Sequence, residues 1–230
     1  MAIKFMILMR YLGEFCATAL LVSLSCLGCA DGSEMPKLQY GLVVMIIIHC
    51  FGFVSGGHAN PCITLACYMM RYISLQMALI YMVAQFLGAL TGFFLLTAML
   101  PPDSINNDLC LVKPNGNLSW DQTFVIELVL TTTLIFGWCA LWDARNSSYL
   151  DSVSLRIGFL VAACSLAGGQ WTGASMNPAI VLVPAAYHQK FDDTLTFMAS
   201  QYSAGIFGPV LWKLLFSKRS FFNSTGSKPC

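Results

Sequence analysis

The sequence predicts an all-α membrane protein with six transmembrane helices, two re-entrant half-helices and an inverted repeat. Three observations support this fold class. The 230 residues are 57% hydrophobic and only 10% charged, whereas about a quarter of the residues in a soluble domain are charged. Apolar runs long enough to span a bilayer recur along the chain. Two short motifs that end in Asn-Pro each follow a long apolar run and open a shorter one.

The two motifs have matching positions in the two halves of the chain. Residues 55–62 read Ser-Gly-Gly-His-Ala-Asn-Pro-Cys, and residues 172–179 read Thr-Gly-Ala-Ser-Met-Asn-Pro-Ala. An Asn suits the N-cap of a helix, and a Pro suits its first position, where the missing N–H costs nothing. Each motif therefore predicts a loop that reaches the membrane midplane and starts a half-helix there. The two boxes are Asn60-Pro61-Cys62 and Asn177-Pro178-Ala179.

The apolar pattern places the remaining elements in order. Lys4 and Arg10 before an apolar run resemble a signal peptide, but Glu14 inside that run argues against one, and the run is long enough to span. The expected helices cover 11–29, 38–54, 76–99, 122–142, 154–170 and 195–216, with re-entrant segments at 55–71 and 171–187. Polar connections are expected at 31–37, 101–120 and between Asp143 and Arg156, and a tail follows from Ser217.

The two halves repeat one another within a single domain over residues 1–230. Repeat one covers about 11–100, the linker about 101–120 and repeat two about 121–217. Glu14 and Gln85 flank the first box much as Glu127 and Gln201 flank the second. Each half has an odd number of spanning helices, so the second half must be inserted upside down, which is an inverted repeat. The small residues Gly88, Gly92, Gly205 and Gly208 would allow close helix packing.

The distribution of Lys and Arg predicts the orientation. A cytoplasmic N-terminus puts nine basic residues inside: Lys4, Arg10, Arg71, Arg145, Arg156, Lys213, Lys218, Arg219 and Lys228. Only Lys37, Lys113 and Lys190 then lie outside, which fits the positive-inside rule. Both termini are expected to be cytoplasmic and the linker to face outward. Asn117-Leu118-Ser119 in that linker is a candidate glycosylation site.

Several other functions find little support in the sequence. The net charge of +1 argues against a nucleic-acid partner. The ten cysteines show no C-x-x-C spacing, and most lie in apolar runs, so we expect small hydrophobes rather than a disulfide framework. No nucleophile–base pair and no phosphate loop indicate an enzyme. No cofactor and no metal site are expected.

Apart from its ends, the whole chain resembles an aquaporin of the major intrinsic protein family. The twin Asn-Pro boxes, the Glu of each half and the six-helix inverted repeat carry this resemblance. It implies a channel for water or small uncharged solutes such as glycerol and urea. It also implies a homotetramer with one pore per subunit, as a multi-pass protein of the lipid bilayer, and we expect the plasma membrane rather than an intracellular one. The first box departs from the family pattern because it ends in Cys62.

The resemblance also assigns roles to individual residues. Glu14, Glu127 and His58 would brace the re-entrant loops; proton carriage by the two carboxyl groups is the alternative. The family's outer selectivity filter maps onto Tyr40, Ser165, Ala174 and Ile180. The family usually has a His or a Gly at the position of Ser165 and an Arg at that of Ile180. Ser165 and Ala174 are small, which predicts an aperture wider than that of a water-only channel. Ile180 predicts an apolar wall suited to the carbon face of glycerol or urea.

The boxes suggest how such a pore would exclude ions. Each Asn would cap its half-helix through its side-chain oxygen and keep two amide N–H donors for the lumen. A water held by both would orient its protons outward in opposite directions, which interrupts proton hopping. The positive ends of two half-helices would repel cations, a device for which aquaporins are a known example. The alternative function is a poorly conducting structural or junction member of the same family.

Overall fold

The computed structural model describes residues 2–30 and 35–216, and this part of the chain is helical without a strand. The predicted tail with Lys218, Arg219 and Lys228, and most of the 31–37 connection, lie outside the described residues. The α-helices are α1 (Ala2–Ala30), α2 (Pro36–Ser55), α3 (Pro61–Met69), α4 (Leu75–Met99), α5 (Trp120–Trp142), α6 (Val153–Gly168), α7 (Pro178–His188) and α8 (Thr194–Phe216). Two 3₁₀ segments, η1 (Pro102–Ser104) and η2 (Ala144–Ser152), lie in the connections.

Within the described residues, the eight α-helices follow the predicted order, and the clearest difference lies at the start of the first helix. The predicted start of the first helix at residue 11 was wrong, because α1 already begins at Ala2. The Met, Leu and Arg residues before position 11 are good helix formers, so the helix continues beyond its apolar run. Lys37, predicted in a connection, lies in the first turn of α2.

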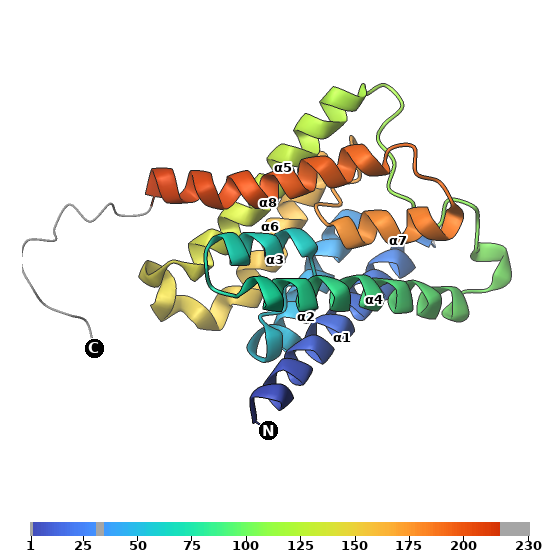
Figure 1. The fold of residues 1–230 in the computed structure, drawn as a ribbon. Coiled ribbons are helices and arrows are strands. Elements are labelled where there is room, and N and C mark those ends of the chain that lie inside the picture. The colour runs from blue at the N-terminus through green and yellow to red at the C-terminus, as the bar shows by residue number, and fades with distance from the viewer. Residues whose placement is uncertain (1, 31–34, 217–230) are drawn as a thin grey trace, which may run out of the picture.

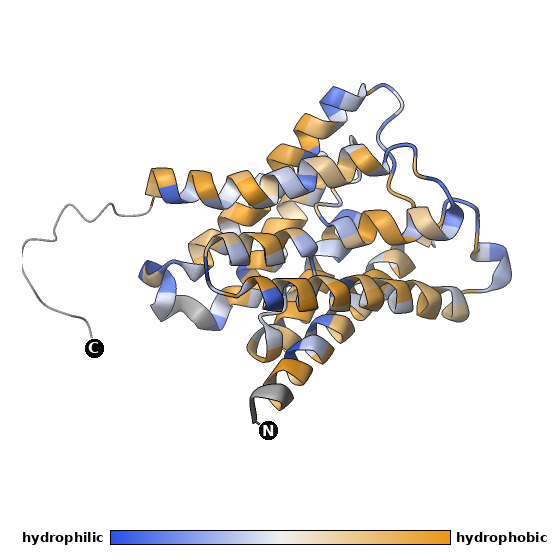
Figure 2. Ribbon diagram, in the orientation of Figure 1, coloured by the Kyte–Doolittle hydropathy of each residue, from blue (hydrophilic) through white to orange (hydrophobic). Residues whose placement is uncertain are grey.

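Within residues 2–30 and 35–216, four helices are long and apolar enough to cross a membrane by length and composition, namely α1, α2, α4 and α5. Helices α6 and α7 are shorter apolar helices, and the 23-residue α8 carries Lys213 in its last turn. Hydrophobic residues dominate the helices, and hydrophilic residues gather in the connections (Figure 2). We call the end of the bundle at the linker 101–119 the outer end, and the end at η2 the inner end.

Pairing of helices brings the two Asn-Pro boxes to the centre of the molecule. Helix α1 packs along α4, as α5 packs along α8, and α2 packs along α6 to join the halves. The short helices α3 and α7 lie nearly end to end between α4 and α8 (Figure 1). Both begin at the Pro of a box, so the two helix N-termini approach one another inside the bundle.

Glycines allow the closest of these contacts. A side chain at Gly88 or Gly92 on α4 would collide with the backbone oxygen of Phe15 or Ala19 on α1. A side chain at Gly208 on α8 would instead meet the side chain of Ile135 on α5. Helix backbones approach this closely in membranes where the interface carries small residues. This is the close packing that the glycine positions predicted.

A disulfide bond joins Cys26 near the outer end of α1 to Cys110 in the linker, with Cα atoms 5.5 Å apart. The prediction that Cys26 serves only as a small hydrophobe was therefore wrong. The linker folds back onto the bundle, where Leu109 is 3% exposed, and this packing brings the two cysteines together. The two partners lie 84 residues apart in the chain, so no local spacing indicated the bond.

Candidate functional site

The two Asn-Pro boxes meet at the centre of the bundle. The side-chain oxygen of Asn60 accepts a hydrogen bond from the backbone N–H of Cys62 at 2.9 Å, and that of Asn177 accepts one from Ala179 at 3.0 Å. Both residues are thus N-caps, with Pro61 and Pro178 at the first helical position. Because α3 and α7 start here, the partial positive charges of two helix N-termini face a common point.

Each Asn also holds the opposite loop. Asn60 Nδ2 donates to the carbonyl of Met176 at 2.8 Å, and Asn177 Nδ2 donates to the carbonyl of Ala59 at 2.9 Å. The prediction that both amide N–H groups of each Asn stay free for the lumen was therefore wrong, because one N–H group of each Asn is bonded to the opposite loop. Ala59 and Met176 have left-handed backbones, with φ of 45° and 49°. Their carbonyls consequently lie outside any helix and need another donor.

The first loop is fastened to a buried carboxylate on α1. Glu14 is fully buried and accepts hydrogen bonds from Ser55 Oγ at 2.7 Å and from Gln85 Nε2 at 2.6 Å. It also accepts the backbone N–H groups of His58 at 3.0 Å and Ala59 at 2.8 Å. These N–H groups belong to the loop before the half-helix, where no helical partner exists. The contacts are those that a bracing role requires.

The second loop repeats this arrangement on α5. Glu127 is fully buried and accepts hydrogen bonds from Thr172 Oγ1 at 2.7 Å and Gln201 Nε2 at 2.9 Å. The hydroxyl of Ser175 lies at 3.3 Å, and the backbone N–H of Met176 donates at 3.2 Å. A Glu, a Gln and a hydroxyl residue therefore occupy equivalent places in the two halves. Buried charges are costly unless hydrogen bonds satisfy them in this way.

His58 lies between the first loop and a group of aromatic rings. Its Nδ1 is 3.1 Å from Thr64 Oγ1, and the side chain is buried. The ring makes edge-on contacts with Tyr81 at a centroid distance of 5.5 Å and with Trp138 at 5.7 Å. The structure thus fixes both the backbone and the ring of His58.

A narrow cavity, which we call the midplane cavity, runs beside the two Asn residues. About 20 Å³ of it is open to the centre of a water molecule, which is room for about one water. Backbone of the first loop forms one part of its wall. The rest comes mainly from apolar and aromatic side chains: Leu21, Tyr40, Val44, Ile47, Ile48, Ile63, Leu134, Trp138, Ile157 and Val161.

A second, wider cavity, which we call the outer cavity, opens toward the linker and offers about 500 Å³ to the centres of water molecules. Tyr40, Ser165 and Ile180 of the predicted filter line it, and Tyr40 lines the midplane cavity as well. The Tyr40 hydroxyl donates to the carbonyl of Ser175 at 3.0 Å. Ala174, the fourth predicted filter residue, is fully buried and is absent from the wall of both cavities.

Lys37, Leu134 and Trp138 are among the wall residues that were not predicted from the sequence. Lys37 lines the outer cavity one helical turn before Tyr40, on the same face of α2. Leu134 and Trp138 line the midplane cavity two and three turns after Glu127 on α5. Helical spacing from Tyr40 and Glu127 would have indicated all three positions. These residues belong to neither the boxes nor the predicted filter, so no motif points to them.

Polar contacts hold the linker over the outer cavity. Asp108 forms ion pairs of 2.8 Å with both Lys113 and Lys190. Hydrogen bonds from these two lysines lower the pKa of the Asp108 carboxyl to about 2. The glycosylation candidate Asn117 is exposed, and Ser119 of the same triplet is the N-cap of α5. An enzyme that modifies the linker side could therefore reach Asn117.

Comparisons with known proteins bear on the family and the fold of the chain. The family profile described as Major intrinsic protein matches residues 2–211. Aquaporin-2 of Bos taurus is 36% identical over 210 residues, which cover 87% of this chain and 76% of the relative. Aquaporin-4 of Homo sapiens is 33% identical over 214 residues, covering 88% and 66%. The X-ray structure of the aquaglyceroporin from Plasmodium falciparum has a similar fold, with a TM-score of 0.78 at 21% identity, covering 93% of this chain and 96% of that one.

Proposed function

The chain belongs to the major intrinsic protein family, and on that premise we propose that it is a passive channel for water and for glycerol and urea. The observation that carries the proposal is the meeting of Asn60 and Asn177 beside the midplane cavity. Two capped helix N-termini and a largely apolar wall surround a space with room for about one water. Such a space suits neutral molecules that pass in single file.

Water would cross this point by exchanging hydrogen bonds with the two boxes. Within the described residues, each Asn keeps one amide N–H after its bond to the opposite loop. A water that accepts from both N–H groups turns its own protons away from the centre. The N-termini of α3 and α7 add partial positive charge. Both effects favour neutral molecules over protons and cations.

Solute passage is supported by the residues of the outer cavity. Ser165 and Ile180 line the mouth at the positions where the family usually has a His or a Gly and an Arg, respectively. Ile180 gives the wall an apolar patch suited to the carbon atoms of a polyol, and Tyr40 stands where the outer cavity meets the midplane cavity. Lys37 supplies a cationic side chain to the outer wall in place of the missing Arg.

We further propose a single channel domain with repeats over 11–100 and 121–217, both termini cytoplasmic, in the plasma membrane. The excess of basic residues on one side supports the orientation. The Cys26–Cys110 disulfide supports it too, because such bonds persist in oxidising compartments and this one lies at the outer end. Glycosylation of Asn117 would occur on the same side. The homotetramer is carried over from the family.

Stopped-flow light scattering on liposomes containing the purified protein tests the proposal. We expect faster responses than in protein-free liposomes under water, glycerol and urea gradients. The alternative, a poorly conducting structural protein, is favoured by one observation: the midplane cavity has room for about one water. Folded, correctly inserted protein that leaves every rate unchanged would support that alternative and overturn the channel.

A further inference from the structure

An aromatic side chain lines the midplane cavity on the inner side of the two Asn residues. Trp138 lines the midplane cavity together with Asn60 and Asn177, and it is 4% exposed. It lies three turns beyond Glu127 on α5, about 16 Å further toward the inner end at 1.5 Å per residue. Trp138 and the outer-cavity residue Ser165 are thus on opposite sides of the Asn pair.

Contacts with other rings hold Trp138 in place. Its ring centroid lies 5.7 Å from that of His58 and 5.5 Å from that of Trp142. The ring centroids of Trp142 and Tyr72 lie 5.7 Å apart. The Tyr72 hydroxyl also donates a hydrogen bond to the Trp142 carbonyl at 2.9 Å. Tyr72 is 54% exposed at the inner end. These four residues, which we call the inner aromatic cluster, therefore connect the inner surface of the protein to the cavity wall.

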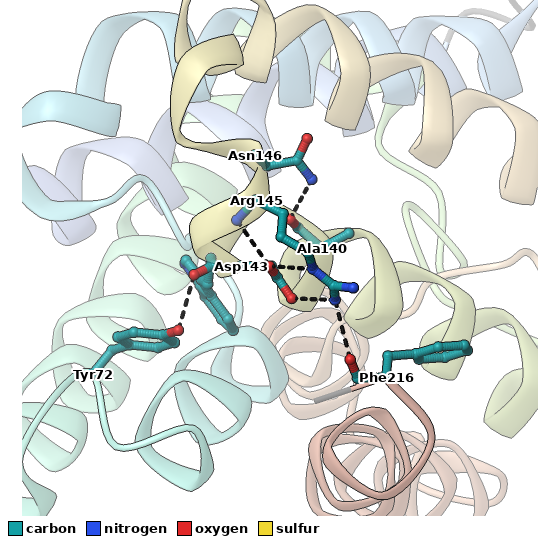
Figure 3. Close-up of polar contacts among 7 residues, drawn as sticks. Tyr72, Ala140, Asp143, Arg145, Asn146 and Phe216 are labelled. Carbon is teal, nitrogen blue, oxygen red and sulfur yellow. Dashed lines mark hydrogen bonds and ion pairs between the residues drawn. The ribbon is translucent and has the colours of Figure 1, made fainter. Parts of the chain in front are cut away.

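Polar contacts fix the end of α5 that carries Trp138 and Trp142. Arg145 pairs with Asp143 and donates to the carbonyl of Phe216 at the end of α8 at 3.2 Å (Figure 3). Asn146 donates to the carbonyl of Ala140 (Figure 3). Hydrogen bonds from Arg145 lower the pKa of the Asp143 carboxyl to about 2, so the pair stays ionised at neutral pH. The inner end of α5 is therefore tied to α8.

We propose that Trp138 is the size-selecting residue of the inner half of the pore. This role deepens the proposed function and rests on it. The outer cavity offers about 500 Å³ to water centres and the midplane cavity about 20 Å³. The size of the largest solute that passes is therefore not limited by the wide outer mouth. The indole, pressed against His58, sets that limit on the inner side of the Asn pair.

The substitution series can separate ring size from hydrogen bonding. No residue in the described part of the chain accepts a hydrogen bond from the indole N–H of Trp138, which is buried. Trp138→Phe consequently removes no bond within the protein and keeps an aromatic ring, whereas Trp138→Val removes the ring. Trp212 on α8 packs against Phe136 and lines neither cavity, so Trp212→Val is the matched control.

The experiment measures glycerol and water permeability of the same proteoliposomes. We expect Trp138→Val to raise the glycerol-to-water ratio several-fold, Trp138→Phe to raise it less, and Trp212→Val to leave it unchanged. Trp138→Leu takes the place of Trp138→Val if the latter does not insert.

Two results would overturn the inference. Water conduction in the wild type with the same glycerol-to-water ratio in all inserted Trp138 variants removes the size-selecting role and leaves the channel intact. Well-folded wild type and Trp138 variants that all fail to conduct either molecule overturn the proposed function, and the role of Trp138 falls with it.

Discussion

At the scale of single residues, the site depends on two buried carboxylates. Glu14 and Glu127 each accept four hydrogen bonds, and each binds its loop through at least one backbone N–H. The loops need these acceptors because they precede the half-helices and lack helical partners. Loop positions, and with them Asn60 and Asn177, therefore depend on side chains far away in the sequence.

Glu14→Gln should lower stability and membrane yield. An amide brings a donor toward Gln85 Nε2 and weakens bonds that a charged acceptor strengthens, each worth about 1.5–3 kcal/mol. Thermal unfolding of the detergent-solubilised protein measures the loss, with Asp103→Asn on the linker as a control. A normal melting temperature combined with an altered proton current would instead support proton carriage by Glu14.

Ile180→Arg should narrow the outer mouth. The guanidinium would add five donors and a permanent charge to the wall of the outer cavity. Glycerol and urea flux should then fall more than water flux, and any cation leak should fall as well. Ile180→Leu, which keeps the wall apolar, is the control.

Surface expression decides how the Ile180 result is interpreted. Ile180 is only 9% exposed and also packs in the core, so Arg there could disturb folding. Loss of the protein from the membrane would identify Ile180 as a packing residue. A well-expressed Ile180→Arg channel with an unchanged glycerol-to-water ratio would contradict its place in the filter.

At the scale of elements, the short helices α3 and α7 are positioned by their long neighbours. Both half-helices contact α4 and α8, and α4 is in turn held against α1. Local sequence predicted where α3 and α7 begin, because Asn-Pro fixes both the cap and the first turn. It did not predict the crossed bonds from Asn60 to Met176 and from Asn177 to Ala59. These bonds depend on how two loops from different halves meet.

Gly88→Val should separate α4 from α1. A side chain at this position meets the backbone oxygen of Phe15, which cannot move without shifting α1. Overpacking of this kind costs about 1–3 kcal/mol, and Gln85 on the same helix would lose its alignment with Glu14. We expect a lower melting temperature and lower water permeability. Gly116→Val in the linker, where a side chain meets open space, is the matched control.

The Gly88 result has a clear contradictory outcome. Equal melting temperatures and equal water permeabilities for Gly88→Val and Gly116→Val would show that the packing of α1 against α4 does not depend on the close approach at Gly88. The packing of the first repeat would then have to rest on other contacts.

At the scale of the whole molecule, the sequence predicted the fold class because its signals are local and repeated. Each half contains apolar runs, one Asn-Pro box and one Glu within an apolar run. The features that it missed join distant segments: the Cys26–Cys110 bond and the contact of Trp138 with His58. Such contacts arise from tertiary packing, which no spacing along the chain encodes.

The same contrast applies to the candidate pore. Tyr40, Ser165 and Ile180 could be placed by their distance from a box, and they do line the outer cavity. Ala174 could be placed equally well, yet it lies behind the wall. Its loop turns through a left-handed backbone, with φ of 50° at Ala174, and the direction of such a residue does not follow from its position in the sequence.

The temperature dependence of osmotic water flow tests directly whether the chain forms a water pore. Purified protein in liposomes should shrink them faster than empty liposomes, with a low activation energy, because water in a pore exchanges hydrogen bonds without entering hydrocarbon. Asn177→Asp, which replaces an amide donor with a carboxyl group at the midplane, should abolish the increase. Flow through inserted wild-type protein with the rate and steep temperature dependence of bare lipid would contradict the account.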